Sequence, residues 1–179
     1  MIIAADGCAD TARYLASANC DERPPGEAIT LLVIHSISLP PGEFGGDAIV
    51  RLFTNELDCS THPYYRTLAG LRVSAHFLIR RAGELLKFVP CTRRAWHAGA
   101  SSWGDRSGCN DFSVGIELEG ADTVPYTEPQ YRVLAELTRA LQSVYPLADV
   151  VGHCDIAPGR KTDPGPNFDW PRLRDSILR

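Results

Sequence analysis

A continuous run of apolar, largely β-branched residues at positions 29–34 (ITLLVI) sets the strongest limit on the architecture. A run of this length and composition is typical of a strand that is buried on both faces. His35 follows directly, and the next segment, SLPPGEFGG, breaks the pattern with prolines and glycines. The sequence therefore predicts an interior strand that delivers a histidine to the rim of a sheet.

Further strands are predicted at residues 112–119, 149–153, 74–81 and 85–89. The segment 112–119 (FSVGIELE) alternates, so that its apolar side chains share one face and Glu117 and Glu119 share the other. The last two segments flank Ala82-Gly83-Glu84 and are typical of a β-hairpin. Residues 91–111, rich in Gly, Ser and Trp, are expected to form a long loop.

Helices are expected near residues 47–57, from Thr127 to just before Pro146, and from Asp169 onward. Thr127 and Gln130 have the spacing of a capping box. Leu134, Leu137, Leu141 and Val144 form its apolar stripe, and Leu173 and Ile177 point inward in the last helix. The expected fold is α/β (α+β): a single domain, residues 29–179, with a central mixed β-sheet flanked by helices, behind an irregular lead-in of residues 1–28.

Composition excludes several classes of function. The net charge of −4 over 179 residues offers no electrostatic footprint for nucleic acid. No apolar stretch approaches the ~18 residues of a membrane span, and the N-terminal sequence lacks the pattern of a secretory signal. We therefore expect a cytoplasmic protein with reduced cysteines, which binds neither nucleic acid nor membrane.

The residues with the clearest potential for chemistry are His35, His153 and Asp163. Each histidine ends a predicted strand, and two histidines with a carboxylate form a familiar catalytic zinc set that leaves a fourth position open for water. The spacing is not that of an HExxH helix, so structural histidines remain an alternative. Glu117 is the candidate proton carrier, with Glu119 as its competitor on the same face.

Lys161 lies two residues before Asp163, so the two side chains would point the same way in an extended segment. A cation beside a metal would stabilise the oxyanion that forms when water attacks an amide. Cysteine–histidine catalysis, for instance by Cys91 and His97, is an alternative that nothing in the spacing selects.

Five segments together carry a family resemblance: LLVIHSISLPPGEFGG (31–46), LRVSAHFLIRRAGELLKFVPC (71–91), RAWHAG (94–99), CNDFSVGIELEG (109–120) and GHCDIAPGRKTDPGPNFDW (152–170). From about Arg23 to its C-terminus the chain resembles the N-acetylmuramoyl-L-alanine amidase family, which includes a phage lysozyme and the peptidoglycan recognition proteins. The resemblance is strongest to cytoplasmic members that act on 1,6-anhydro muropeptides during cell-wall recycling.

This resemblance implies a zinc amidase whose partner is a small soluble muropeptide, and whose loss in many bacteria induces β-lactamase. We expect the protein to be a monomer. The implied zinc ligands are His35, His153 and Asp163. The resemblance also favours Glu117 over Glu119 as the catalytic carboxylate, with Lys161 as its partner. The implied substrate-binding residues are Tyr64 near the metal, Arg72, His97 and Ser36.

Two positions depart from the family pattern. Ser36 stands where the family usually has Asn, and Gly108 stands where it tends to have Arg. A guanidinium at the second position could grip a peptide carboxylate, and Arg106 in the same loop could replace it. The sequence leaves open two other functions, a sensing module that binds fragments without cutting them and an exported amidase that acts on intact wall.

Overall fold

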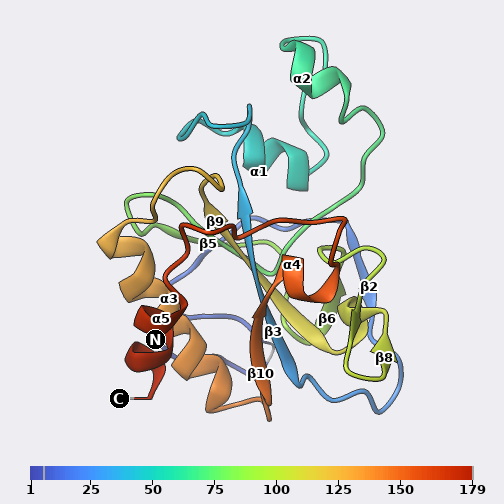
Figure 1. The fold of residues 1–179 in the computed structure, drawn as a ribbon. Coiled ribbons are helices and arrows are strands. Elements are labelled where there is room, and N and C mark those ends of the chain that lie inside the picture. The colour runs from blue at the N-terminus through green and yellow to red at the C-terminus, as the bar shows by residue number, and fades with distance from the viewer. Residues whose placement is uncertain (6, 179) are drawn as a thin grey trace.

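Strand β3 (Leu31–Ile37) lies inside a six-stranded sheet, and its first five residues are buried. A computed structural model describes residues 1–5 and 7–178 (Figure 1). The strand order is β1-β5-β4-β9-β3-β10. The other strands are β1 (Arg13–Tyr14), β4 (Phe77–Ile79), β5 (Leu85–Lys87), β9 (Ser113–Glu119) and β10 (Asp149–Gly152).

The sheet is mixed, as predicted. Strands β4, β9, β3 and β10 run parallel, and β5 pairs antiparallel with β4 to form the expected hairpin. The predicted end of β3 is wrong, because the strand continues two residues past His35 to Ile37. The ladder with β9 continues to the pair Ile37 and Glu119, which keeps the last two residues of β3 in the sheet.

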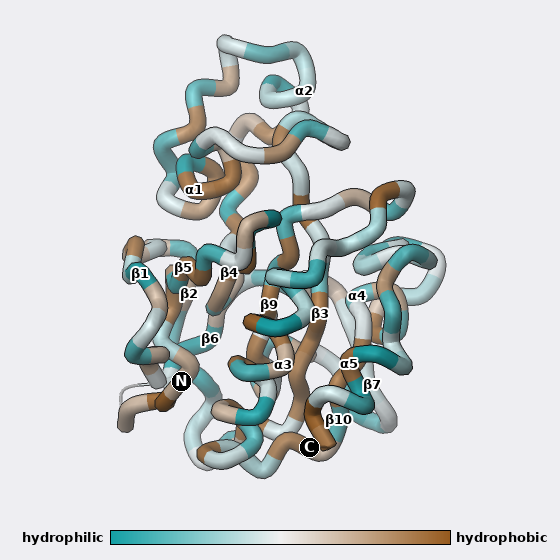
Figure 2. The backbone as a smooth tube through the Cα atoms, turned by 90° about the vertical axis from the view of Figure 1, so that its left-hand side faces the viewer, coloured by the Kyte–Doolittle hydropathy of each residue, from teal (hydrophilic) through white to brown (hydrophobic). Residues whose placement is uncertain are grey.

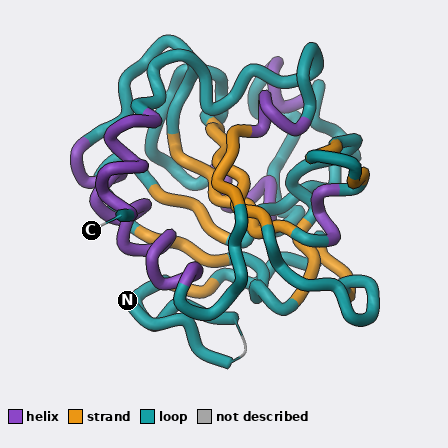
Figure 3. Tube along the Cα trace, turned by 60° about the horizontal axis from the view of Figure 1, so that its bottom comes forward, coloured by secondary structure: helices purple, strands orange, loops and turns teal. Residues whose placement is uncertain are grey.

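Helices α3 (Glu128–Gln142) and α5 (Trp170–Ile177) pack together on one face of the sheet (Figures 1 and 3). The predicted capping box at Thr127 and Gln130 is present, and the Asp169 side chain caps α5. Leu134, Leu137, Leu141 and Leu173 are buried in the core beneath these helices. The inward prediction for Val144 is wrong: α3 ends at Gln142, and the Val144 side chain is 47% exposed.

The opposite face carries shorter elements. Helix α4 (His153–Ile156) follows β10 without a linker. The prediction that His153 ends the strand is therefore wrong, because His153 is the first residue of the helix. The segment predicted as one long loop contains β6 (Arg93–Ala95), β7 (Ser102–Trp103), β8 (Arg106–Ser107) and the 3₁₀ helix η1 (Cys109–Asp111). Most of residues 1–28 lies outside helices and strands, but this segment supplies β1 and β2 (Cys20–Glu22), which pairs with β6.

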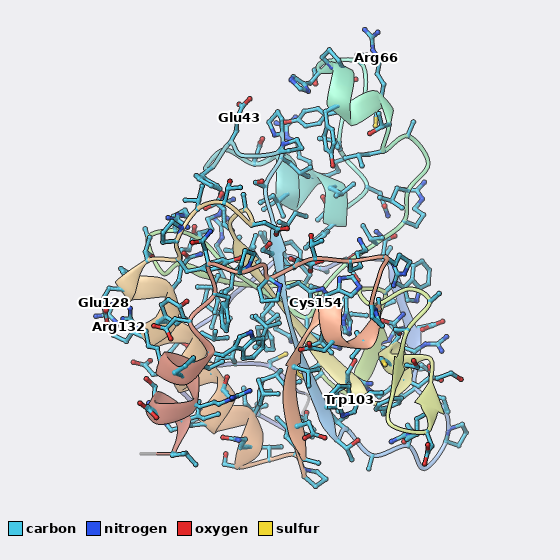
Figure 4. All side chains as sticks on the ribbon, in the orientation of Figure 1. Glu43, Arg66, Trp103, Glu128, Arg132 and Cys154 are labelled. Carbon is cyan, nitrogen blue, oxygen red and sulfur yellow. The ribbon has the colours of Figure 1, made fainter. Side chains whose placement is uncertain are left out.

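Helices α1 (Ala48–Phe53) and α2 (Pro63–Arg66) project beyond the carboxyl ends of the parallel strands (Figure 1). In Figure 4 the labelled side chains of Glu43 and Arg66 mark the outer side of this projection. Along the backbone, hydrophobic residues concentrate in the central strands (Figure 2). Among the described residues, no helix is both long enough and apolar enough to cross a bilayer.

Candidate active site

Three adjacent parallel strands bring polar side chains to the same edge of the sheet. Strand β3 carries His35, β9 carries Glu117 directly opposite it in the ladder, and His153 follows β10. Asp163 comes from the segment that returns over this edge after α4. In open sheets of parallel strands, ligands bind outside the carboxyl ends of the strands, and this is where the four residues meet.

The predicted ligand set is brought together. Nδ1 of His35 lies 2.9 Å from Nδ1 of His153. Oδ2 of Asp163 lies 3.4 Å from the first nitrogen and 3.1 Å from the second. Within the described residues, these three side chains form the cluster of His, Cys, Asp and Glu that could hold a metal ion.

The spacing of these atoms fits zinc. Zinc–nitrogen bonds of 2.0–2.1 Å in a tetrahedron place neighbouring ligand atoms about 3.3 Å apart, and the observed separations are 2.9–3.4 Å. Burial lowers the pKa of His35 to about 4, so its imidazole is neutral at physiological pH, the form that can ligate a metal. Burial would raise the pKa of Asp163, but hydrogen bonds with His153 and His35 outweigh it and hold this pKa below its usual range.

The two carboxylates on β9 differ in their surroundings. Glu119 is 2% exposed, and its oxygens accept hydrogen bonds from the backbone N–H groups of Gly45 and Arg81. Oε2 of Glu117 is buried and has no hydrogen-bond partner among the described residues. Burial, and then the negative charge of Asp163, raise the pKa of Glu117 well above its ordinary value. A carboxylate in that state is suited to accept and release a proton.

A cavity of about 530 Å³ opens over these residues. This volume lies in the range of small-molecule sites. Glu117, Lys161 and Asp163 line one part of it, and apolar side chains from α1 and the segment after α2, including Leu52, line another. Tyr64, predicted near the metal, also lines the cavity.

Of the other predicted substrate contacts, Ser36 and His97 line the cavity together with Tyr64, whereas Arg72 does not. Arg72 is exposed and is not part of the cavity lining, although Leu71 and Val73 on either side of it are. The Ser36 backbone N–H points to Oδ2 of Asp163 at 3.4 Å, and its side chain hydrogen-bonds with Tyr126.

His97 lines the cavity, but the residue is only 9% exposed and its two ring nitrogens already lie near partners inside the protein.

Gly108, at the second departure from the family pattern, has a left-handed backbone conformation. This residue has φ 71° and precedes η1, a left-handed conformation that favours glycine over arginine. Arg106 does not replace a guanidinium in the cavity. It forms an ion pair with Glu27 and lies over the ring of Phe112.

Residues that the sequence did not single out hold the loop beside the site. Oδ1 of Asn110 accepts hydrogen bonds from the backbone N–H groups of His97 and Ala98. Nη2 of Arg160 donates to the carbonyl groups of Ala98 and Ala100. No sequence pattern marked them, because each acts on backbone atoms from a position 12 or more residues away.

Below the site, His76 is fully buried, and its Nδ1 accepts the backbone N–H of Gly115. Burial, and then the charge of Arg23, lower the pKa of His76 to about 3. The unfolded chain therefore takes up a proton near pH 6.5 that the folded protein does not, and stability falls as pH drops from about 6.5 toward 3.

Between pH 6 and 4.5, the free energy of unfolding of the metal-free protein should fall with falling pH more steeply than that of the His76→Leu variant. We expect the two slopes to differ by about 1.4 kcal/mol per pH unit. Urea denaturation across this range measures both slopes. Equal slopes would show that His76 is charged in the folded protein.

The comparisons agree with this geometry. The N-acetylmuramoyl-L-alanine amidase family matches residues 25–166. The 1,6-anhydro-N-acetylmuramyl-L-alanine amidase AmpD of Escherichia coli is 58% identical over 165 residues, covering 91% of this chain and 90% of AmpD. The AmpD of Haemophilus influenzae is 48% identical over 168 residues, covering 92% and 91%.

Solved structures of amidases are also similar to this chain. A crystal structure of AmpD superposes with a TM-score of 0.96 at 55% identity and covers 99% of both chains. The Escherichia coli amidase AmiD, in complex with the substrate anhydro-N-acetylmuramic acid-L-Ala-D-gamma-Glu-L-Lys, has a TM-score of 0.62 at 28% identity. That match covers 88% of this chain and 65% of AmiD.

The mixed sheet and the cavity at its carboxyl edge are therefore those of an amidase, and the chain belongs to the N-acetylmuramoyl-L-alanine amidase family. The resemblance inferred from the sequence is confirmed. Within this family the chain is similar to AmpD over nearly its whole length.

Proposed function

We propose that this protein is a zinc-dependent 1,6-anhydro-N-acetylmuramyl-L-alanine amidase of peptidoglycan recycling. It hydrolyses the amide between the lactyl group of anhydro-N-acetylmuramic acid and L-alanine in small soluble muropeptides. A cytoplasmic location and a monomeric state stay predictions, as does the link to β-lactamase induction.

One observation carries the proposal. The ligand set of His35, His153 and Asp163 lies at the cavity that Glu117 also lines, and Oε2 of Glu117 has no hydrogen-bond partner within the described part of the chain. A metal set alone can serve structure or chemistry, but a nearby carboxylate with a raised pKa supplies the proton carrier that hydrolysis needs. The similarity to AmpD supports the choice of bond and the anhydro sugar.

Zinc held by these three side chains would supply Lewis-acid activation of water and of the amide carbonyl. Glu117 accepts the proton of the attacking water as its oxygen bonds to the carbonyl carbon. The same carboxyl group then donates that proton to the amide nitrogen, the carbon–nitrogen bond breaks, and L-alanine leaves with a neutral amine. The other product carries the new carboxyl group on the lactyl carbon.

Lys161 has a separate task in this proposal. Its ammonium lines the cavity beside Asp163 and is close enough to Glu117 to oppose the rise of that residue's pKa. A fixed positive charge at this place stabilises the negative oxygen that develops on the carbonyl during attack. Tyr64, in the same lining, is a proposed substrate contact. Arg72 is a second one: it is exposed and lies between the lining residues Leu71 and Val73.

The test is mass spectrometry of the purified protein incubated with anhydro-muramyl tripeptide, with and without a zinc chelator. We expect release of free tripeptide that the chelator abolishes and added zinc restores. Binding of the fragment without release would identify a sensing module instead. Faster release of peptide from whole sacculi than from the soluble fragment would indicate an enzyme of the intact wall.

A further inference from the structure

Both histidines of the proposed zinc set contact the dipeptide His97-Ala98, which lies in the loop after β6. Nε2 of His35 lies 2.9 Å from Nδ1 of His97. Nε2 of His153 lies 3.2 Å from the carbonyl oxygen of Ala98. In each ligand the nitrogen that faces away from the ligand set is therefore the one that meets this dipeptide.

We propose that His97-Ala98 fixes both zinc-binding histidines in the form that presents Nδ1 to the metal, and that His97 is a positioning residue, not a substrate contact. The inference rests on the zinc site of the proposed function. A neutral imidazole carries its hydrogen on one nitrogen only. A hydrogen bond from Nε2–H therefore leaves Nδ1 free as a ligand and sets the orientation of the ring.

The orientation of the His97 ring follows from its second partner. Nε2 of His97 lies 3.1 Å from Oγ of Ser113, a fully buried residue at the start of β9. If Nε2 of His97 donates its hydrogen to this hydroxyl, Nδ1 of His97 has a free lone pair for His35. Hydrogen bonds thus run from His35 through His97 to Ser113, and each one requires the next.

Packing leaves the His97 ring little room to move. A Cβ placed on Gly115 would lie 2.5 Å from Cγ of His97, so the ring rests directly on a glycine of β9. The backbone of the dipeptide is fixed as well: Oδ1 of Asn110 accepts both of its N–H groups, and Arg160 donates to the Ala98 carbonyl at 2.8 Å. This loop is therefore built as a rigid outer layer of the metal site.

The test compares zinc affinity in three variants by competition with a chromophoric chelator at pH 7.5. His97→Leu removes the acceptor for His35 and should weaken zinc binding by about 10–100-fold. His97→Asn places an amide oxygen the same number of bonds from the backbone as Nδ1 and should recover most of that loss. His76→Leu is the control for loss of a buried imidazole. His76 packs edge-on against His97, with 5.6 Å between ring centroids, but its nitrogens face the Gly115 N–H and the Arg93 carbonyl, so the variant keeps the contact between His35 and His97 and should bind zinc as the parent protein does.

Long-range ¹H–¹⁵N spectra of the imidazole nitrogens give a readout that loss of stability alone would not move. In the zinc-loaded parent protein, His35 should show a protonated Nε2 and a metal-bound Nδ1. In His97→Leu these signals should broaden or shift, whereas in His76→Leu they should not.

Zinc affinity and His35 signals that stay unchanged in His97→Leu would overturn the inference, and so would an equal loss of affinity in His76→Leu. Failure of the parent protein to bind zinc would instead reject the proposed function, so the two failures are distinguishable.

Discussion

Replacement of Glu117 by glutamine should reduce turnover of anhydro-muramyl tripeptide by about 10²–10⁴-fold, the range that a positioned proton carrier contributes, while zinc stays bound. The amide of glutamine has nearly the shape of the carboxylate, but it cannot take the proton of the attacking water. Glu117 is not one of the three clustered ligands, so the metal set is intact. Steady-state kinetics and zinc content by atomic absorption measure the two effects separately.

Glu119→Gln is the matched control, because it makes the same chemical change two residues along the same strand. Both oxygens of Glu119 accept backbone N–H groups, so this variant loses a structural hydrogen bond. We expect it to be less stable than the parent protein and to keep nearly normal turnover at temperatures where it is folded. Near-normal turnover in Glu117→Gln would show that another group carries the proton.

In the metal-free protein, the two variants should change stability in opposite directions: Glu119→Gln should be less stable than the parent protein, and Glu117→Gln more stable. The raised pKa of Glu117 means that the folded state disfavours its charged form, so at neutral pH its ionisation costs stability. Glu117→Gln should therefore unfold at a higher temperature than the parent at neutral pH, because glutamine is uncharged in both the folded and the unfolded state and does not carry this cost. A residue shaped by selection for folding alone would not show this combination of less activity and more stability.

Much of this architecture follows from the sequence because its signals are local. The β-branched run of β3, the hairpin turn at Gly83 and the capping box of α3 each specify their own element. The errors arise where distant contacts decide. Strand β3 extends past His35 because Ser36 and Ile37 still pair with β9, and Val144 is exposed because α3 ends two residues earlier.

The same distinction between local signals and distant contacts separates the site residues that could be predicted from those that could not. His35, Glu117 and His153 could be expected at one edge because the first two lie near the carboxyl ends of their strands and His153 directly follows β10, and parallel strands share their carboxyl edge. Glu119 could not be told from Glu117 by alternation alone, since only the folded chain shows that Gly45 and Arg81 satisfy its oxygens. The role of His97 depends on contacts with His35 and Ser113, 62 and 16 residues away, which no local pattern encodes.

Asp163→Asn should weaken zinc binding by more than about 100-fold, because loss of an outer-layer partner alone costs 10–100-fold and this change removes a direct ligand. The neutral amide keeps the shape of the side chain but not its charge. Turnover should fall with zinc occupancy and recover in part at high zinc concentration. The measurement is a zinc titration in competition with a chelator, followed by activity at each free zinc concentration.

Asp155→Asn is the control for Asp163→Asn, since its carboxylate lies eight residues earlier, in α4, accepts the backbone N–H of Gly152 and is not in the ligand set. It should bind zinc normally.

In the metal-free protein, the lowered pKa of Asp163 means that its carboxylate stabilises the fold at pH values above the pKa of the unfolded chain, and this stability is lost as the pH falls. Asp163→Asn should therefore also lower the stability of the metal-free protein at neutral pH, opposite to Glu117→Gln. Full zinc occupancy in Asp163→Asn would exclude Asp163 as a ligand, and equal stability effects in the two variants would contradict the opposite electrostatic environments on which their separate roles rest.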